Sequence, residues 1–255
     1  MTLSLRGKKI LITREASQAK QFSVNIQRAE GIPIEVPLLK ISCQKESGNR
    51  IDLSQYKWVF FTSAHGVRCF FQGLGPNQEL LSNCFFATVG HKTENALKEF
   101  GYEADFIPSI YNAEVMAEEF FTRFPDANHI LLVRGNLSRK LLVEELTKRG
   151  LTFETVVVYE TNPYLENKGL LLNTLENEEL DFLTFTSPST VKTFMQMVEQ
   201  SPFKEKVSQI PCVCIGTTTE RVAKSFHFAQ TVVPQTFTIE KMVECMVEFV
   251  NTEDE

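Results

Sequence analysis

Short apolar runs alternate with longer amphipathic stretches along almost the whole chain. The runs are about 4 to 6 residues long, and the stretches between them repeat apolar residues with helical spacing over about 10 to 15 residues. Such alternation predicts βαβ units, in which parallel strands form a sheet that helices cover on both faces. We therefore expect an α/β protein whose strands are buried on both sides.

The same order of predicted elements occurs twice, with an offset of about 120 residues. Residues 8–39 begin with KKILITR and are matched by residues 129–158, which begin with HILLVRG. Further along, WVFFTSAHGVRCFF is matched by FLTFTSPSTVKTFM, FFATVGHKTENALKEFG by VCIGTTTERVAKSFH, and ADFIPSIYNAEVMAEEF by QTVVPQTFTIEKMVECM. The chain is therefore predicted to contain two copies of one unit.

Polar and small residues mark the ends of the predicted helices. Thr93 and Ser187 stand where a side-chain oxygen could cap the start of a helix, and Gly101 and Gly150 stand where a helix should end. These signals place a helix directly after each of several strands.

Two extended, β-branched segments, 34–41 and 153–161, each follow the first helix of a copy. Because they occupy equivalent places in the repeat, we interpret them as connectors between two lobes.

Composition narrows the possible functions. Of 255 residues, 43% are hydrophobic and 23% are charged, as in globular proteins, and the net charge of −6 argues against nucleic-acid binding. The amino terminus lacks a signal-peptide pattern, and no apolar run is long enough to span a membrane, so a cytoplasmic protein is expected. The six cysteines form no C-x-x-C pair and the four histidines are scattered, so we expect reduced thiols and no metal site.

The first candidate binding feature is a turn with the sequence Thr-Ser at the end of a strand. Thr62 and Ser63 follow one predicted strand, and Ser187 follows its counterpart. Backbone N–H groups at a helix start lack internal partners and, with nearby hydroxyls, can bind an anion. Simple N-capping, worth about 1 kcal/mol each, explains one such site equally well. Two copies at equivalent strand ends favour a ligand.

A second pair of strand ends carries Gly90 with Thr93, and Gly216 with Thr218 and Thr219. Neither turn matches a P-loop or a G-x-G-x-x-G motif, so a nucleotide is not predicted. The hydroxyl groups suit carboxylates or hydroxyls of a ligand.

Three arginines and one tyrosine complete the candidate chemistry. Arg14, Arg134 and Arg139 lie at or just after strand ends and could bind carboxylates, although surface salt bridges would explain them as well. Tyr159 follows an apolar strand and has a hydroxyl that could give a proton, although packing is its commoner role. The sequence shows no Ser-His-Asp, Cys-His or paired-carboxylate arrangement.

The ordered set of motifs resembles the uroporphyrinogen-III synthase family. It consists of ILITR, VFFTSAHGV, ATVGHKTENAL, VRGNLSR, VVYETNP, FTSPSTV and CIGTTTERVA. The resemblance covers nearly the whole chain, and the set is more specific than any one motif. His65 and Thr217 depart from the residues usual in the family at their positions.

The resemblance implies two parallel-sheet, flavodoxin-like α/β lobes that are joined by a two-stranded β ladder, with a cleft between them. We expect residues 1–36 and 163–255 to form one discontinuous lobe, residues 41–157 the other, and residues 37–40 and 158–162 the connectors.

The resemblance also implies cofactor-free cyclisation of hydroxymethylbilane to uroporphyrinogen III, with loss of water and inversion of ring D through a spiro intermediate. Tyr159 is then the candidate general acid. The expected substrate-binding residues are Arg14, Thr62, Ser63, Thr93, Asn112, Arg134, Arg139, Ser187, Ser189, Thr218 and Thr219. The implied protein is a cytoplasmic monomer of tetrapyrrole biosynthesis that binds neither metal, nucleic acid nor membrane and receives its substrate from hydroxymethylbilane synthase.

Three other classes share parts of this pattern: a non-catalytic two-lobed anion-binding protein, a two-lobed sugar-nucleotide transferase, and an inactive regulatory protein derived from the synthase fold. The missing nucleotide turn disfavours the transferase. The inactive derivative is the main alternative.

Overall fold

The computed structural model describes residues 4–44 and 51–253 of the chain. The chain divides into two compact units. Unit 1 comprises residues 1–40 and 162–255, and unit 2 comprises residues 41–161. Unit 1 is therefore built from two separate stretches of sequence, whereas unit 2 is continuous.

Unit 1 is a doubly wound parallel sheet. Its elements are β1 (Lys9–Ile12), α1 (Ala16–Arg28), β2 (Ile32–Glu35), α6 (Lys168–Asn177), β8 (Phe182–Phe185), α7 (Pro188–Val198), α8 (Lys204–Gln209), β9 (Cys212–Cys214), α9 (Thr217–Ser225), β10 (Thr231–Val232) and α10 (Ile239–Glu253). The strands lie in the order β2-β1-β8-β9-β10, and all of these pairs are parallel. Within the unit this is the order 2-1-3-4-5, the flavodoxin-like arrangement that was predicted.

Unit 2 has a related sheet. Its elements are β3 (Leu39–Cys43), β4 (Trp58–Phe61), α2 (Ala64–Leu74), β5 (Phe85–Thr88), α3 (His91–Lys98), α4 (Ala113–Arg123), β6 (Ile130–Gly135), α5 (Leu141–Lys148) and β7 (Phe153–Pro163). The order is β3-β7-β6-β4-β5, with β7, β6, β4 and β5 parallel. A parallel bridge between Ala87 and Phe106 extends the sheet beyond β5.

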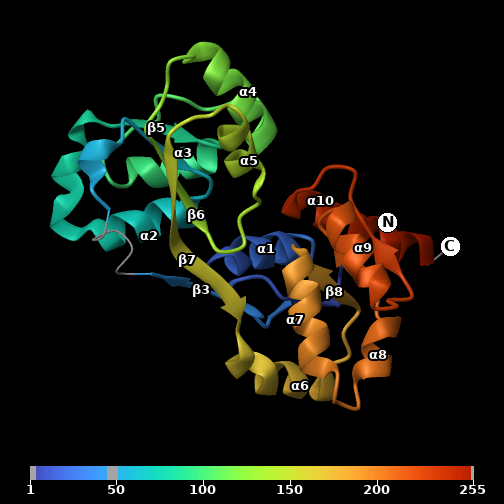
Figure 1. The fold of residues 1–255 in the computed structure, drawn as a ribbon. Helices are drawn as coiled ribbons and strands as arrows, with labels where there is room; N and C mark the ends of the chain where they lie inside the picture. Colours follow the sequence, from blue (N-terminus) through green and yellow to red (C-terminus); the bar gives the residue numbers. More distant parts are fainter. Residues whose placement is uncertain (1–3, 45–50, 254–255) are drawn as a thin grey trace. The chain divides into compact units, whose positions relative to one another are not determined.

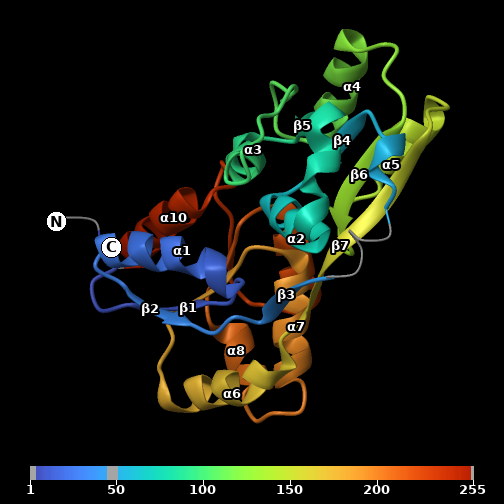
Figure 2. The same cartoon turned by 90° about the vertical axis from the view of Figure 1, so that its left-hand side faces the viewer.

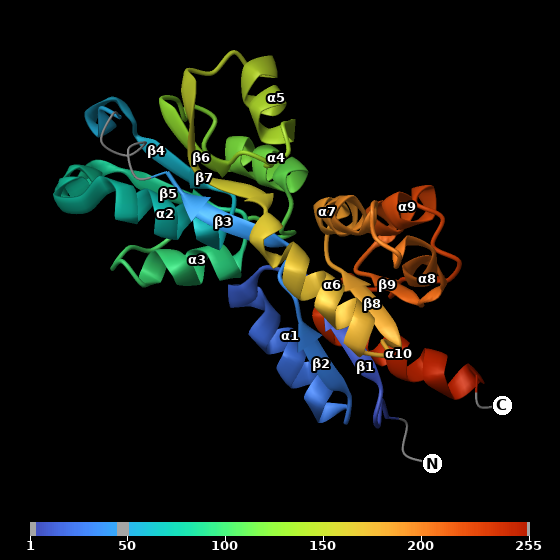
Figure 3. The same cartoon turned by 90° about the horizontal axis from the view of Figure 1, so that it is seen from below.

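Strict alternation of side chains divides each sheet into two buried faces. In β4, Val59 and Phe61 pack with α2 and α3, whereas Trp58 and Phe60 pack with α4 and α5. Figure 3 shows these two helix pairs on opposite sides of the unit 2 strands. In unit 1, α1 and α10 lie side by side on one face (Figure 2), and α6, α7 and α9 cover the other. The continuous apolar runs in the sequence therefore belong to strands that are covered twice.

Each sheet contains strands from both copies of the repeat. In unit 1, Ile10 of β1 pairs with Phe182 of β8, and in unit 2, Ile130 of β6 pairs with Trp58 of β4. Strands β1 and β2, from the first copy, thus occupy the same positions in the unit 1 sheet as β6 and β7, from the second copy, occupy in the unit 2 sheet. Each sheet is completed by strands from the other copy. The duplication predicted from the sequence is present in three dimensions with its halves exchanged.

Strands β3 and β7 form the ladder in which the chain passes from one unit to the other (Figure 1). The N–H of Gln44 donates to the carbonyl of Val158 at 2.8 Å, and the N–H of Tyr164 donates to the carbonyl of Leu38 at 2.8 Å. This pairing runs antiparallel, because the residue number falls on one strand as it rises on the other.

The expectation that all cysteines are reduced is wrong for two of them. Cys43 of β3 forms a disulfide with Cys69 of α2, across a Cα–Cα distance of 5.1 Å. The two cysteines are 26 residues apart on different elements, and only the packing of α2 beside β3 brings them together. The free cysteines of the described residues are Cys84, Cys212, Cys214 and Cys245.

None of the helices in the described parts of the chain has the length and apolar character needed to cross a bilayer. Within the same residues, no three or more His, Cys, Asp or Glu side chains are grouped so that they could hold a metal ion.

Candidate functional site

The turn after β4 joins a helix start to the tyrosine that was singled out in the sequence. Ser63 precedes α2, and its Oγ accepts a hydrogen bond from the N–H of Gly66 at 3.0 Å. The same Oγ lies 3.1 Å from the phenolic oxygen of Tyr159. The cap and the candidate acid are therefore parts of one hydrogen-bonded group.

The position of Tyr159 depends on a glycine in the neighbouring strand. Tyr159 pairs with Gly135, where the register between β6 and β7 shifts. A Cβ on Gly135 would lie only 2.3 Å from Cζ of the tyrosine ring. The bare backbone of Gly135 thus lets the ring lie directly against it, and the N–H of Asn136 donates to the Tyr159 carbonyl at 3.1 Å. The phenol is held by the sheet on one side and by Ser63 on the other.

A cavity of about 400 Å³ opens at the ends of β4 and β5, and both Thr62 and Thr93 line it. The prediction that Thr93 caps α3 is wrong. Gly90 precedes the helix, which starts at His91, so that Thr93 lies in the first turn with only 6% of its surface exposed. Gly90 therefore occupies the N-cap position. Thr93 lies three residues further along, inside the helix, and its N–H donates to the Gly90 carbonyl.

The equivalent strand ends in unit 1 present a similar set of hydroxyls. Ser187 caps α7, as predicted. It forms a capping box with Thr190, and its Oγ lies 2.9 Å from that of Ser189. After β9, Thr219 is buried in the first turn of α9 and Thr218 is exposed. Each unit therefore groups hydroxyl donors at the carboxyl edge of its sheet.

Two arginines at equivalent positions of the repeat have hydrogen-bond donors that lack an acceptor. Among the described residues, Nε of Arg14 and Nε of Arg134 are buried without a hydrogen-bond partner. Burial lowers the pKa of Arg14, and an Nη group of Arg134 donates to the Ser138 carbonyl at 2.7 Å. An unpaired buried donor is costly, so each Nε–H calls for a hydrogen-bond acceptor nearby. Arg139 is exposed and is not part of this pattern.

Asn112 has a structural role. Its side-chain oxygen caps α4 by accepting from the N–H of Val115 at 2.8 Å. Thr238 occupies the equivalent place in the repeat and accepts from the N–H of Lys241 at 3.3 Å.

Two exposed aromatic residues were missed by the sequence analysis. The ring of Tyr111 lies on Gly90, where a Cβ would come within 3.0 Å of it, and the ring of Phe237 lies on Gly216, where the distance would be 3.2 Å. Both side chains are 57% exposed. Tyr111 also lines the cavity with Thr62 and Thr93. Their matched positions in IYNAEVM and TFTIEKM were the signal that could have found them.

The sheets and their donors define a duplicated, doubly wound α/β protein with hydroxyl and N–H donors at the strand ends. The family model described as Uroporphyrinogen-III synthase HemD matches residues 20–244. The chain belongs to this family.

Curated relatives agree with this assignment, and a solved structure has a similar fold. The chain is 28% identical to the "Porphyrin biosynthesis protein HemD" of Ruminiclostridium josui over 97% of its own length, and it spans about half (50%) of that longer protein. It is 27% identical to the uroporphyrinogen-III synthase of Synechococcus elongatus, with 94% of each chain covered. The crystal structure of uroporphyrinogen-III synthetase from Helicobacter pylori 26695 has a similar fold, with a TM-score of 0.68, 18% identity, and coverage of 95% of this chain and 99% of that one.

Proposed function

We propose that the protein is a uroporphyrinogen-III synthase that cyclises hydroxymethylbilane without a cofactor, with loss of water and inversion of ring D. The observation that carries the proposal is the placement of Tyr159. Its hydroxyl lies 3.1 Å from the Oγ of Ser63, at the strand edge where Thr62 lines a cavity. A proton donor is thus fixed beside hydroxyl groups suited to a polar, acidic substrate.

The donors at the strand ends of each unit are proposed to hold carboxylates of the substrate. Hydroxyl groups and helix N–H groups at the strand ends can each bind one carboxylate oxygen. The unpaired Nε atoms of Arg14 and Arg134 favour negative charge at equivalent places. The exposed rings of Tyr111 and Phe237 offer flat apolar surfaces for pyrrole rings.

In the proposed reaction, Tyr159 donates its proton to the terminal hydroxyl group as the carbon–oxygen bond breaks, so that water leaves. The remaining azafulvene cation is attacked by ring D to give the spiro intermediate, and closure after rearrangement releases a proton. Because the linear substrate also closes unaided to the unrearranged isomer, the enzyme mainly has to orient the chain. A hundredfold advantage over that closure requires about 2.7 kcal/mol of transition-state stabilisation, which orientation can supply.

The test is incubation with freshly prepared hydroxymethylbilane, followed by chromatographic separation of the type I and type III isomers. We expect the type III isomer to dominate with the parent protein. Tyr159→Phe should slow its formation substantially, whereas Tyr164→Phe, which removes a phenol from the same stretch of chain, should not. If only the type I isomer forms in the presence of the folded parent protein, the result would instead support an inactive, anion-binding derivative of the fold.

The proposed setting is the cytoplasm, where the protein acts as a monomer and receives its substrate from hydroxymethylbilane synthase. Thiol titration of the denatured protein without reductant should count four free cysteines, those outside the Cys43–Cys69 disulfide.

A further inference from the structure

A second and larger cavity lies at the opposite ends of the two strands that carry the candidate site. Trp58 is the first residue of β4 and Phe85 is the first residue of β5, whereas Thr62 and Gly90 follow the last residues of these strands. The cavity has a volume of about 530 Å³, within the range of small-molecule sites. A strand of four residues separates the two edges by about 13 Å, so this cavity is not part of the site described above.

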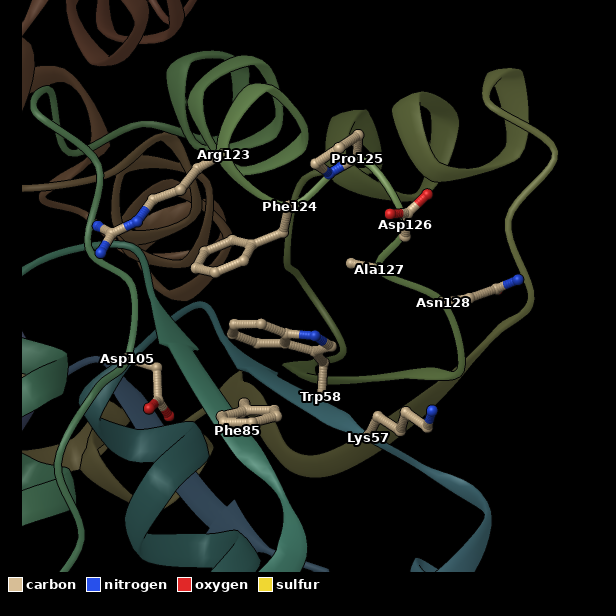
Figure 4. A pocket seen from close by; sticks show the side chains of 10 residues that line it. All are labelled: Lys57, Trp58, Phe85, Asp105, Arg123, Phe124, Pro125, Asp126, Ala127 and Asn128. Atoms are coloured by element: carbon tan, nitrogen blue, oxygen red, sulfur yellow. The ribbon is translucent and has the colours of Figure 1, made fainter.

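Aromatic rings form the centre of this cavity. The ring centroid of Trp58 lies 5.1 Å from that of Phe85 and 4.8 Å from that of Phe124. Figure 4 shows the three rings grouped together, with Arg123 and Lys57 on opposite sides of the group. Phe85 is 50% exposed, although it stands in a strand. The cavity therefore presents an open aromatic face to solvent.

Two cations without an ion pair among the described residues lie beside the rings. Neither Lys57 nor Arg123 has an ion pair with any carboxylate in the described part of the chain, and the guanidinium of Arg123 lies 5.3 Å from the ring centroid of Phe124. Of the two lining acids, Asp105 already accepts a hydrogen bond from the N–H of Phe86 at 2.8 Å. The lining therefore carries two cations that have no ion-pair partner in the described residues, together with the carboxylates of Asp105 and Asp126.

The duplicated chain provides an internal comparison. Phe182 takes the place of Trp58 in unit 1, and Pro211 takes the place of Phe85. Phe182 is 2% exposed, close to the 6% of Trp58, and packs edge-on against Phe249 at 5.6 Å. The units differ at the second position, where proline replaces the 50% exposed Phe85, so the exposed aromatic ring is a feature of unit 2.

From these observations we propose that the cavity around Trp58 and Phe85 is a binding site for a flat aromatic anion, separate from the site of tetrapyrrole cyclisation. The ligand stacks on Phe85 and the edge of Trp58. Its acidic group lies near Arg123.

The sequence supplies its own reporter, because Trp58 is the single tryptophan among the 255 residues. A ¹⁵N–¹H spectrum of the full chain therefore contains one indole N–H resonance, which we would follow while 2-naphthoate is added. We expect a saturable shift with a dissociation constant on the order of 1 mM, the affinity expected for a ligand of this size. The neutral 2-naphthamide should bind about two- to fivefold more weakly, and cyclohexanecarboxylate, which has no aromatic face, should not shift the resonance.

Three variants test the residues that carry the proposal. Phe85→Ala should weaken 2-naphthoate binding about two- to tenfold, and Arg123→Gln should remove the preference for naphthoate over naphthamide. Arg149→Gln is the matched control, because it removes a cation from the ring of Phe121 outside the cavity and should change nothing. Isomer formation from hydroxymethylbilane should be unchanged in Phe85→Ala.

The proposal is overturned by a resonance that does not move, or by an equal shift with cyclohexanecarboxylate. It is also overturned by unchanged binding in a folded Phe85→Ala protein. None of these results bears on the cyclisation, which is measured separately in the same samples.

Discussion

The close contact between Gly135 and Tyr159 gives the sharpest test of the proposed mechanism. In Gly135→Ala the new Cβ would lie 2.3 Å from Cζ and 2.7 Å from the hydroxyl oxygen of the tyrosine. Carbon atoms in contact normally stay about 3.5 to 4.0 Å apart, so the ring must withdraw by at least about 1 Å. A misplacement of that size costs about a hundredfold in rate, which corresponds to about 2.7 kcal/mol.

The assay is steady-state formation of the type III isomer, measured together with the melting temperature. Because the ring is the free end of a side chain and can move, we expect Gly135→Ala to lose turnover while it remains folded. Gly169→Ala is the control, since a Cβ there meets nothing within 4 Å. Combining Gly135→Ala with Tyr159→Ala should be no slower than Tyr159→Ala alone, because the clash has been removed. Parent-like kinetics in a folded Gly135→Ala protein would refute the reasoning.

Three further predictions concern other parts of the molecule. Tyr111→Ala and Phe237→Ala should each raise KM for hydroxymethylbilane about two- to tenfold, and steady-state kinetics with unchanged KM would remove the rings from the site. Ser187→Ala should lower the free energy of unfolding in urea by about 1 kcal/mol, through loss of the cap of α7. The hydrogen bond from Lys98 lowers the pKa of Glu94 below its ordinary value of 4.5, so this stabilisation exists above that pH and is lost as the pH falls through the lowered pKa. Glu94→Gln should therefore be less stable than the parent at neutral pH, by less than about 1 kcal/mol because the pair is near the surface. Unfolding curves measured at a pH below the lowered pKa of Glu94 should show no difference in stability between the two proteins.

The repeat made most of the fold predictable from the sequence. Strands buried on both faces read as continuous apolar runs, and the duplicated order of elements indicated two sheets of the same topology. Local signals were less reliable. The hydroxyl of Ser187 caps a helix as predicted, whereas Gly90 takes the position that was assigned to Thr93. After α1 a non-glycine residue, Glu30, adopts the left-handed conformation, and the neighbouring Gly31 provides space beside Ile26, where a Cβ would come within 2.8 Å.

Features that depend on tertiary packing could not be read from the sequence. The disulfide between Cys43 and Cys69 requires α2 to lie beside β3, and sequence spacing carries no sign of it. The space that Gly135 leaves for Tyr159 depends on the register of β6 and β7. The unpaired Nε atoms of Arg14 and Arg134 become visible only when burial is known, because a surface arginine has the same sequence context.

The exchange of halves between the two sheets sets an order for folding during translation. Strand β1 pairs with β8, and the paired residues Ile10 and Phe182 are 172 positions apart. At about 5 to 20 residues per second, roughly 10 to 30 s separate the emergence of these two strands from the ribosome. Unit 2 has all of its sequence available before β8 is made, so the nascent chain can complete that unit while β1, α1 and β2 still lack their partners. During this interval one edge of β1 lacks the strand that pairs with it in the finished sheet.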